Sequence, residues 1–176
     1  MSDLLLSALL IALLGLGACA QHTRTGQMVS ASTELSSLQF PDELQGNIEV
    51  RYVSGAQEDN PLWHSEVNNQ QFSDALKRSL AAVKLGSEEA NYELDIELLR
   101  IDYPVLGFNT TVSTHIHYRL LNKQTEETYF EQKVVSPYTV TQDEAFLAAE
   151  RLRLATEGSA KTNIKVFLRR LAQKTA

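Results

Sequence analysis

This sequence has very little cysteine and lacks the motifs of several common enzyme classes. Cys19 is the only cysteine in 176 residues, so the chain cannot form an internal disulfide or a zinc site with several thiolates. The patterns G-x-S-x-G, H-E-x-x-H, G-x-G-x-x-G and the P-loop are also absent, which removes the usual sequence signals for several hydrolases and nucleotide enzymes. The sequence therefore predicts a non-enzymatic protein without a cofactor.

Positive charge is not in excess either. The chain has 16 Lys and Arg against 22 Asp and Glu, a formal net charge of −6 and a pI near 5.2. This balance excludes the basic footprint of a general nucleic-acid-binding protein. Hydrophobic residues make up 43% and charged residues 22%, as in globular chains. The length suits one domain with an appendage.

The N-terminal apolar run is too short for a transmembrane helix. Residues 4–16 carry no charge and match the length of a signal-peptide core, whereas a membrane-spanning helix needs about 20 apolar residues. The start, Met-Ser-Asp, lacks the usual Lys or Arg. A buried helix with a core cysteine is the alternative. The terminal position and the polar sequence that follows favour a signal peptide over residues 1–18.

The end of this run, Leu16-Gly17-Ala18-Cys19, resembles the lipobox of bacterial lipoproteins. The resemblance implies that the chain is cleaved before Cys19, whose sulfur carries two acyl chains and whose amino group carries a third. Two or three acyl chains anchor a protein stably to a membrane. Ala20 follows the cysteine in place of Asp, which by resemblance to enterobacterial lipoproteins implies sorting to the outer membrane, facing the periplasm.

Residues 19–46 are predicted to form the lipidated cysteine and a flexible tether. They are rich in Gln, Ser and Thr, and their apolar residues keep no steady period. A flexible segment of this size spans roughly 25 Å. The folded domain is predicted to occupy residues 47–176.

Within that domain, alternating apolar residues predict strands at 47–53, 92–98, 112–120 and around 130–134. The first strand is expected to turn Ile48, Val50 and Tyr52 to one side. An apolar stripe at helical spacing predicts a helix over 68–84, ended by Gly86.

The last helix is predicted to begin near Thr141, because Thr141 and Glu144 form a capping-box pattern. It should run to about Lys174, with Phe146 among its apolar members and a bend at Gly158. Pro137 is expected to end the preceding strand.

The resulting order, β-α-β-β-β-α, predicts an α+β two-layer sandwich with both helices on one face of a mixed four-stranded sheet. This order behind a lipidated cysteine is similar to the LPS-assembly lipoprotein and the YajG-like lipoproteins. The runs "NPLW" (60–63), "FSDALKRSL" (72–80) and "RLRLATEGSAKTNIKVFLRRL" (151–171) resemble more specifically a family of uncharacterised envelope lipoproteins.

Two histidines, His115 and His117, are predicted to share one sheet face. Their spacing occurs in metal sites, and with a carboxylate they could bind zinc. The favoured interpretation is a ladder of opposite charges across strands. The predicted neighbours are Glu97 and Lys133 for His115, Asp95 and Glu131 for His117, and Glu93 for Arg119.

A basic stripe on the last helix contains Lys161, Lys165 and Arg169 at four-residue spacing. It could bind an anionic lipid or glycan, although a solvated helix face is the favoured interpretation. Tyr103, Leu106 and Phe108 on a long turn are candidates for exposed apolar contact, with folding onto the core as the favoured use. Trp63, next to His64, is expected to pack between sheet and helix.

Three functions remain open from the sequence. The leading hypothesis is an outer-membrane lipoprotein that docks an envelope protein partner through its sheet edge or open face. The second is a carrier that holds a lipid or glycan between helices and sheet. The third is a metal-dependent hydrolase using His115 and His117.

Overall fold

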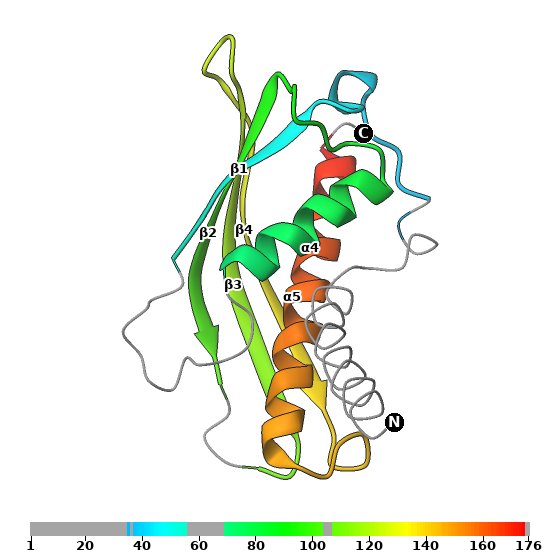
Figure 1. The fold of residues 1–176 in the computed structure, drawn as a ribbon, viewed down its shortest axis with the longest axis vertical. Helices are drawn as coiled ribbons and strands as arrows, with labels where there is room; N and C mark the ends of the chain where they lie inside the picture. Colours follow the sequence, from blue (N-terminus) through cyan, green and yellow to red (C-terminus); the bar gives the residue numbers. More distant parts are fainter. Residues whose placement is uncertain (1–34, 36, 56–68, 104–106, 175–176) are drawn as a thin grey trace, which may run out of the picture.

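The computed structural model describes residues 35, 37–55, 69–103 and 107–174. They form an α+β sandwich in the order β-α-β-β-β-α, which confirms the predicted fold class (Figure 1). The elements are a 3-10 helix η1 (Asp42–Leu44), β1 (Ile48–Ser54), α4 (Asn69–Ala82), β2 (Tyr92–Asp102), β3 (Thr110–Asn122), β4 (Thr128–Val140) and α5 (Ala148–Gln173).

The sheet has the strand order β1-β2-β3-β4. β1 pairs in parallel with β2 across the α4 crossover, and the two remaining pairs are antiparallel. Figure 1 shows α4 and the longer α5 on the same face of this sheet. The mixed sheet with one helical layer is therefore as the sequence predicts.

The main core lies between that helical layer and the sheet. From α4 it receives Phe72, Ala75, Leu76 and Leu80, all buried at the predicted stripe positions. From α5 it receives Phe167, whose ring stacks on Tyr118 at a centroid distance of 4.2 Å. A smaller second cluster contains Ile101, Val112, Val140, Ala145 and Ala155.

Polar side chains fix α5 on the sheet. Asn163 is fully buried; its amide donates to the backbone carbonyls of Thr114 (3.0 Å) and Val134 (3.1 Å). Its carbonyl accepts the Tyr118 hydroxyl at 2.9 Å. Ser159, also buried, donates to the Ser136 carbonyl at 2.7 Å. Because each bond joins α5 to β3 or β4, the helix cannot slide without leaving buried polar groups unpaired.

The end of α4 lies earlier than the predicted stop at Gly86. The helix ends at Ala82, and Lys84 takes a left-handed conformation (φ 60°). The Leu85 N–H then returns to the Leu80 carbonyl at 2.9 Å. Leu85 is fully buried, so the chain reverses where this leucine can enter the core.

The first strand departs from simple alternation. A bulge between Val50 and Tyr52 shifts its register against β2. Ile48 and Val50 are buried as predicted, but beyond the bulge it is Val53 that packs against the core. One extra residue reverses the phase of a strand, which alternation alone does not reveal.

The prediction that Pro137 ends the last strand is wrong. β4 continues to Val140, and Pro137 lies opposite Ser113 in β3. Because β4 is at the edge of the sheet, a residue without an N–H is tolerated in it.

The predicted start of the last helix is also wrong. Glu144 does accept hydrogen bonds from the Thr141 backbone N–H (2.8 Å) and hydroxyl (2.9 Å), but these close a turn, and α5 begins only at Ala148. The capping pattern is thus present without a helix behind it. Phe146, expected in the helix stripe, lies in the connection.

Leu35, Leu38, Phe40 and Leu44, all within the predicted tether 19–46, pack in or against the main core. Leu35 and Leu44 are 1% and 0% exposed and belong to the main core. These two leucines of the predicted tether therefore pack in the domain core. The sequence did not predict this packing, because the apolar residues of this segment follow neither a helical nor a strand period.

Gly158 has a packing role against β4. A Cβ built on Gly158 would lie 2.3 Å from Cδ1 of Tyr138. The helix therefore approaches the β4 edge at a position where only glycine leaves room for that ring.

Candidate docking site

The outer face of the sheet carries the predicted charge ladder, but in a different register. Glu97 lies opposite His117, and Asp95 lies opposite Arg119. On the other side of β3, His117 lies opposite Lys133 and Arg119 opposite Glu131. The predicted direct pairings are therefore wrong by two residues, although the Glu131 side chain does contact His117 as predicted. The cause is that turn lengths and a bulge between Leu98 and Arg100 set the register.

Each histidine contacts a different carboxylate. His115 Nε2 lies 2.8 Å from Asp102 Oδ2, and His117 Nε2 lies 2.9 Å from Glu131 Oε1. The hydrogen bond from His115, with help from the Arg100 charge, lowers the pKa of Asp102 below its ordinary value. Within the described ranges, no three His, Cys, Asp or Glu side chains are placed to hold a metal ion together. This geometry is that of a cross-strand ladder.

A second ladder segment surrounds Asp95. Its carboxylate lies 3.0 Å from the Arg119 guanidinium and 3.4 Å from Nε of Arg51. Arg51 also forms an ion pair with Glu93. Charges of opposite sign thus cover this part of the face, whereas Val135, opposite His115, is 50% exposed.

The space between the helices and the sheet is small. The cavity lined by Phe72, Leu98, Ile116 and Ala160, among others, has a volume of about 20 Å³. That volume is enough for about one water molecule. This part of the described interior does not accommodate the lipid or glycan that the carrier hypothesis requires.

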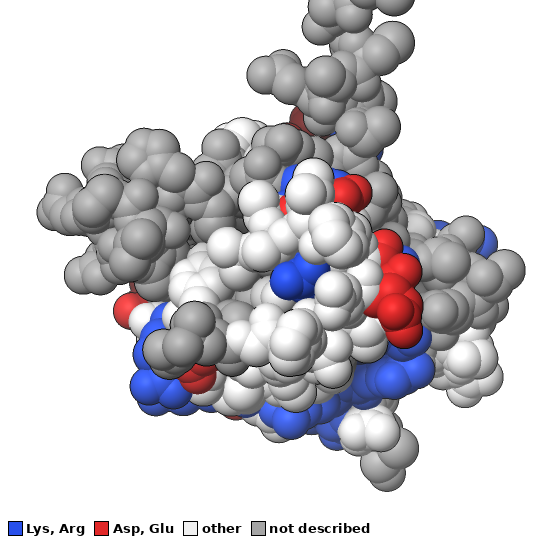
Figure 2. Space-filling view, turned by 90° about the horizontal axis from the view of Figure 1, so that it is seen from below, with Lys and Arg blue, Asp and Glu red and all other residues white. Residues whose placement is uncertain are grey.

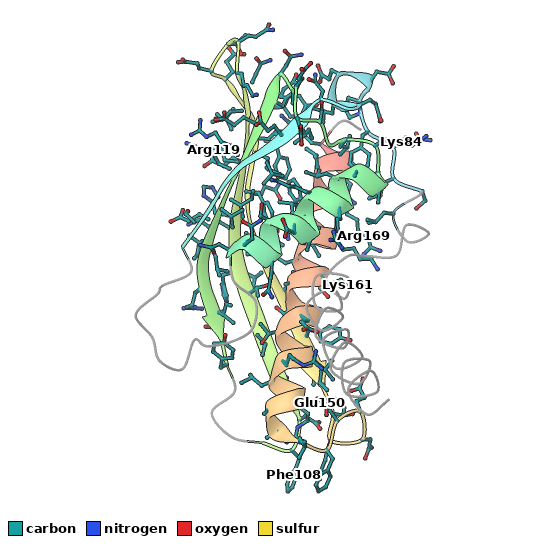
Figure 3. The ribbon with its side chains drawn as sticks, in the orientation of Figure 1. Lys84, Phe108, Arg119, Glu150, Lys161 and Arg169 are labelled. Atoms are coloured by element: carbon teal, nitrogen blue, oxygen red, sulfur yellow. The ribbon has the colours of Figure 1, made fainter. Side chains whose placement is uncertain are left out.

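The basic stripe follows one side of α5. Lys161 and Lys165 are half-buried and Arg169 is exposed, and Figure 3 shows Lys161 and Arg169 along the same side of the helix. Lys161 and Lys165 line an open groove of about 460 Å³ between α5 and the end of β4. We call it the α5–β4 groove; its other lining residues are Tyr138, Val140, Glu144, Leu154, Glu157, Gly158 and Thr162.

One end of the molecule exposes large apolar side chains. Phe108 and Phe146 are each 79% exposed, and Leu147 is 63% exposed. Phe108 precedes β3, and the other two follow β4, at the end where Thr110 pairs with Val140. We call these three residues the apolar end. Figure 3 shows Phe108 at the lower extremity, and Figure 2 shows a largely uncharged surface there.

A buried arginine holds the loop of the apolar end. Arg151 is 7% exposed and donates from Nη1 to the backbone carbonyls of Ala145 (2.9 Å) and Phe146 (2.6 Å). Ala145 is buried in the second cluster. The Thr141 N–H lowers the pKa of Glu144, whose carboxylate closes the preceding turn. Phe146 and Leu147 are therefore presented on a braced loop.

The sequence identified only part of this site. Phe108 was a candidate for exposed contact and is exposed; Tyr103 packs against the second cluster. Phe146 was assigned to a helix stripe and Leu147 was missed. The sequence did contain one signal for this exposure. Phe146 and Leu147 are adjacent, and two neighbouring large residues cannot both lie on a narrow apolar stripe of a helix.

Several predictions lie outside the described residues. They include the signal peptide 1–18, the lipidated Cys19, Trp63, His64 and Leu106. In the portion of the chain that is described, no helix has both the length and the apolarity to cross a membrane.

No protein-family model matches the chain, and no curated protein matches it. Solved structures do share its fold. Protein XCC0632 from Xanthomonas campestris, of family DUF330, aligns with a TM-score of 0.56 and 10% identity, covering 78% of this chain and 93% of that one. The "putative lipoprotein" of Caulobacter crescentus CB15 aligns with a TM-score of 0.50 and 16% sequence identity, covering 76% of this chain and 92% of that one.

A third structure, hypothetical protein CT253 from Chlamydia trachomatis, has a TM-score of 0.51 and 10% identity, covering 74% of this chain and 95% of that one. At these identities the likeness concerns the fold. The fold is therefore shared with the protein named "putative lipoprotein" from Caulobacter crescentus.

Proposed function

We propose that this chain is a non-enzymatic lipoprotein of the bacterial envelope, anchored in the outer membrane through Cys19, that docks a protein partner through its apolar end. The observation that carries the proposal is the display of Phe108, Phe146 and Leu147 at one end, with the last two on a loop braced by Arg151. Well-ordered aromatic and aliphatic side chains are the usual anchors of protein interfaces.

Two further observations support this function over the alternatives. The cavity of about 20 Å³ between helices and sheet offers no room for a carried lipid. The two histidines of the hydrolase hypothesis contact separate carboxylates, Asp102 and Glu131. The docking surface differs from the sheet edge or open face favoured by the sequence, because the open face is occupied by ion pairs.

The anchor is tested first with the full chain expressed in a Gram-negative host. We expect palmitate labelling and recovery in the outer-membrane fraction, both lost in Cys19→Ser. Labelling that persists in this variant contradicts the anchor, and recovery in the inner membrane contradicts the sorting.

Docking is tested by placing a photoreactive amino acid at position 146 of the anchored chain, with position 84 as control. Lys84 is also exposed and lies far from Phe108 in Figure 3. We expect protein crosslinks in intact envelopes from position 146 and not from position 84. Crosslinks to lipid alone from position 146 favour a lipid-binding protein and reject docking.

A further inference from the structure

We propose that the α5–β4 groove binds an uncharged oligosaccharide, with the Tyr138 ring as the surface on which one sugar unit packs. This inference goes beyond the proposed docking function, because it assigns a ligand to a surface separate from the three residues of the apolar end. The two surfaces adjoin each other: Val140 and Glu144 line the groove, and Phe146 follows two residues after Glu144. A sugar in the groove would therefore lie beside a docked protein partner.

Tyr138 provides an aromatic surface that is held in place. The residue is 40% exposed and lines the groove, and its ring packs on the backbone of α5. A Cβ built on Gly158 would lie 2.3 Å from Cδ1, 2.4 Å from Cε1 and 2.7 Å from Cγ of the ring. The ring thus fills the space that a side chain at position 158 would occupy. An aromatic face carries a negative quadrupole and attracts the C–H groups on one side of a sugar ring.

Donor and acceptor groups line the same groove. Among the described residues, neither the Lys161 ammonium nor the Tyr138 hydroxyl forms a hydrogen bond or an ion pair. Glu144 accepts both bonds from Thr141 on Oε2, at 2.8 and 2.9 Å, so its Oε1 can accept from a ligand. Lys165 already takes part in an interaction, and we assign the cationic donor role to Lys161 alone.

The other acid of the groove is already paired. Glu157 is 2% exposed and accepts hydrogen bonds of 3.1 Å on both carboxylate oxygens from the Arg153 guanidinium. Arg153 also lies 4.0 Å from Glu150. These charges satisfy one another without a ligand. The groups that the groove offers to a ligand are therefore one ammonium, one hydroxyl and one carboxylate oxygen.

This set of groups favours a sugar over other ligands. An acyl chain would cover the Lys161 ammonium and the Glu144 carboxylate without giving either a hydrogen bond, which is unfavourable. An anionic ligand would meet the Glu144 charge as well as that of Lys161. The hydroxyls of an uncharged sugar both donate and accept, so they can bind all three groups while the C–H face covers the ring.

The groove has room for such a ligand. Its volume of about 460 Å³ lies within the roughly 300–1,000 Å³ of pockets that bind small molecules. It is open and follows the side of α5, where Figure 3 places Lys161. An internal unit of a longer oligosaccharide can therefore bind without a free chain end.

The test measures binding to the full-length chain by isothermal titration calorimetry, in a detergent that has no sugar headgroup. The uncharged probes are cellotetraose and the tetramer of N-acetylglucosamine. The charged probes are tetragalacturonate and the tetramer of glucosamine. We expect an uncharged probe to bind about tenfold more tightly than either charged one. No binding of either uncharged probe, or tighter binding of a charged one, overturns the proposal.

Variants locate the binding in the groove. Tyr138→Ala should weaken it about tenfold because the ring is lost, whereas Tyr138→Phe keeps the ring and should weaken it about threefold. Lys161→Met should weaken it about tenfold, because a charged donor is lost. The controls are Lys84→Met and Phe108→Ala, at exposed positions outside the groove lining, and both should bind as the wild type does. Equal affinity of Tyr138→Ala and the wild type overturns the proposal.

A spectroscopic measurement guards against variants that simply misfold. In the wild-type chain, the uncharged probe should shift the backbone amide signals of Gly158 and Thr162, which both line the groove, and leave that of Lys84 unchanged. Unshifted amides at positions 158 and 162 in the presence of binding place the sugar elsewhere and overturn the proposal.

The sugar site and the docking function can fail separately. Protein crosslinks from position 146 should persist in Tyr138→Ala, because this ring is not part of the apolar end. Protein crosslinks without sugar binding reject the sugar site and leave the docking function standing. Sugar binding without protein crosslinks supports the sugar site and rejects the docking function.

Discussion

Aromatic residues are packed against other side chains at one end of this sandwich and exposed to solvent at the other. At the packed end, which we define by Leu44, Tyr92, Tyr129 and Lys174, the Tyr92 and Tyr129 rings meet edge to face at 5.2 Å, and the Lys174 ammonium lies 4.1 Å from the Tyr129 ring centroid. At the apolar end, Phe108 and Phe146 remain 79% exposed.

This difference shows that the same two layers serve two purposes. The packed end receives a chain segment, Leu35 to Leu44, that covers it and completes the core. The apolar end receives no such cover within the described ranges, yet its loop is braced by Arg151. A hydrogen-bonded loop that holds apolar side chains exposed to solvent is the arrangement expected of a surface that binds a partner.

The largest expected contrast is between two phenylalanines. Phe167 is fully buried, stacks on Tyr118 and meets Phe130 edge to face at 5.7 Å. Phe167→Ala should lower the free energy of unfolding by about 3–5 kcal/mol, the usual cost of a large cavity. Phe146→Ala should change it by less than about 0.5 kcal/mol. Urea unfolding monitored by circular dichroism measures both; similar losses would remove the distinction between buried and displayed aromatics.

The next effect concerns the polar bonds between α5 and the sheet. Asn163→Ala leaves the buried Tyr118 hydroxyl without its acceptor at 2.9 Å, and a buried unsatisfied group costs about 1–3 kcal/mol. Thr162→Ala is the matched control, because the Thr162 hydroxyl bonds only within the helix, to the Gly158 carbonyl. Equal urea midpoints for the two variants would show that these bonds do not hold the layers.

A more local effect is expected from Arg151→Met. This change keeps an apolar stem but removes both hydrogen bonds to the loop carbonyls, at a cost of about 1–3 kcal/mol. Amide hydrogen exchange should rise at residues 145–147 and stay constant at the packed end. Arg169→Met, at an exposed position, is the control. Unchanged exchange in the loop argues against bracing.

Alkaline pH should weaken the packed end. Burial, followed by the hydrogen bond and charge of Glu43, raises the pKa of Tyr129 to about 12. The folded state therefore holds the phenol neutral. The resulting stabilisation is complete below the ordinary phenol pKa of about 10 and is lost as the pH rises to about 12. Carbon NMR of the tyrosine rings follows this titration, and Glu43→Gln should shift it to lower pH. An unshifted titration in that variant excludes Glu43 as a cause.

Acidic pH should loosen the apolar end, with the smallest effect of the five. The Thr141 backbone N–H, and then its hydroxyl, lower the pKa of Glu144. Stabilisation from a lowered carboxyl pKa is present above the ordinary value and is lost as the pH falls through the folded value. Exchange of the Thr141 amide should increase over that range, and Glu144→Gln should abolish the pH dependence. A pH-independent amide contradicts the contact.

Periodicity predicted the order of elements and the buried face of α4, because side-chain spacing reports directly which face meets the core. It failed where a local pattern had more than one structural outcome. Pro137 is compatible with an edge strand, and the Thr141–Glu144 pattern closes a turn as readily as it caps a helix. Strand register, bulges and the docking of Leu35 depend on contacts between distant segments.

The same limit applies to the site. The cysteine motif, the basic stripe and the charge ladder were visible as residues, and Phe108 was visible as a candidate for exposure. The directly opposed ladder residues are two positions away from the predicted ones because the register of a hairpin depends on its turns; the predicted contact between Glu131 and His117 is present. Phe146 was misplaced because the start of a helix depends on tertiary packing as well as on its cap.

The sequence by itself determined the alternation of strands and helices, the likeness of Cys19 to a lipidation site and the absence of common catalytic motifs. These properties depend on neighbours along the chain. Only the tertiary structure decided which apolar residues are covered and which are displayed, that Arg151 braces the loop, and that the lysines of α5 line a groove. Such properties depend on the packing of residues that are remote in sequence, and a linear pattern carries no measure of that packing.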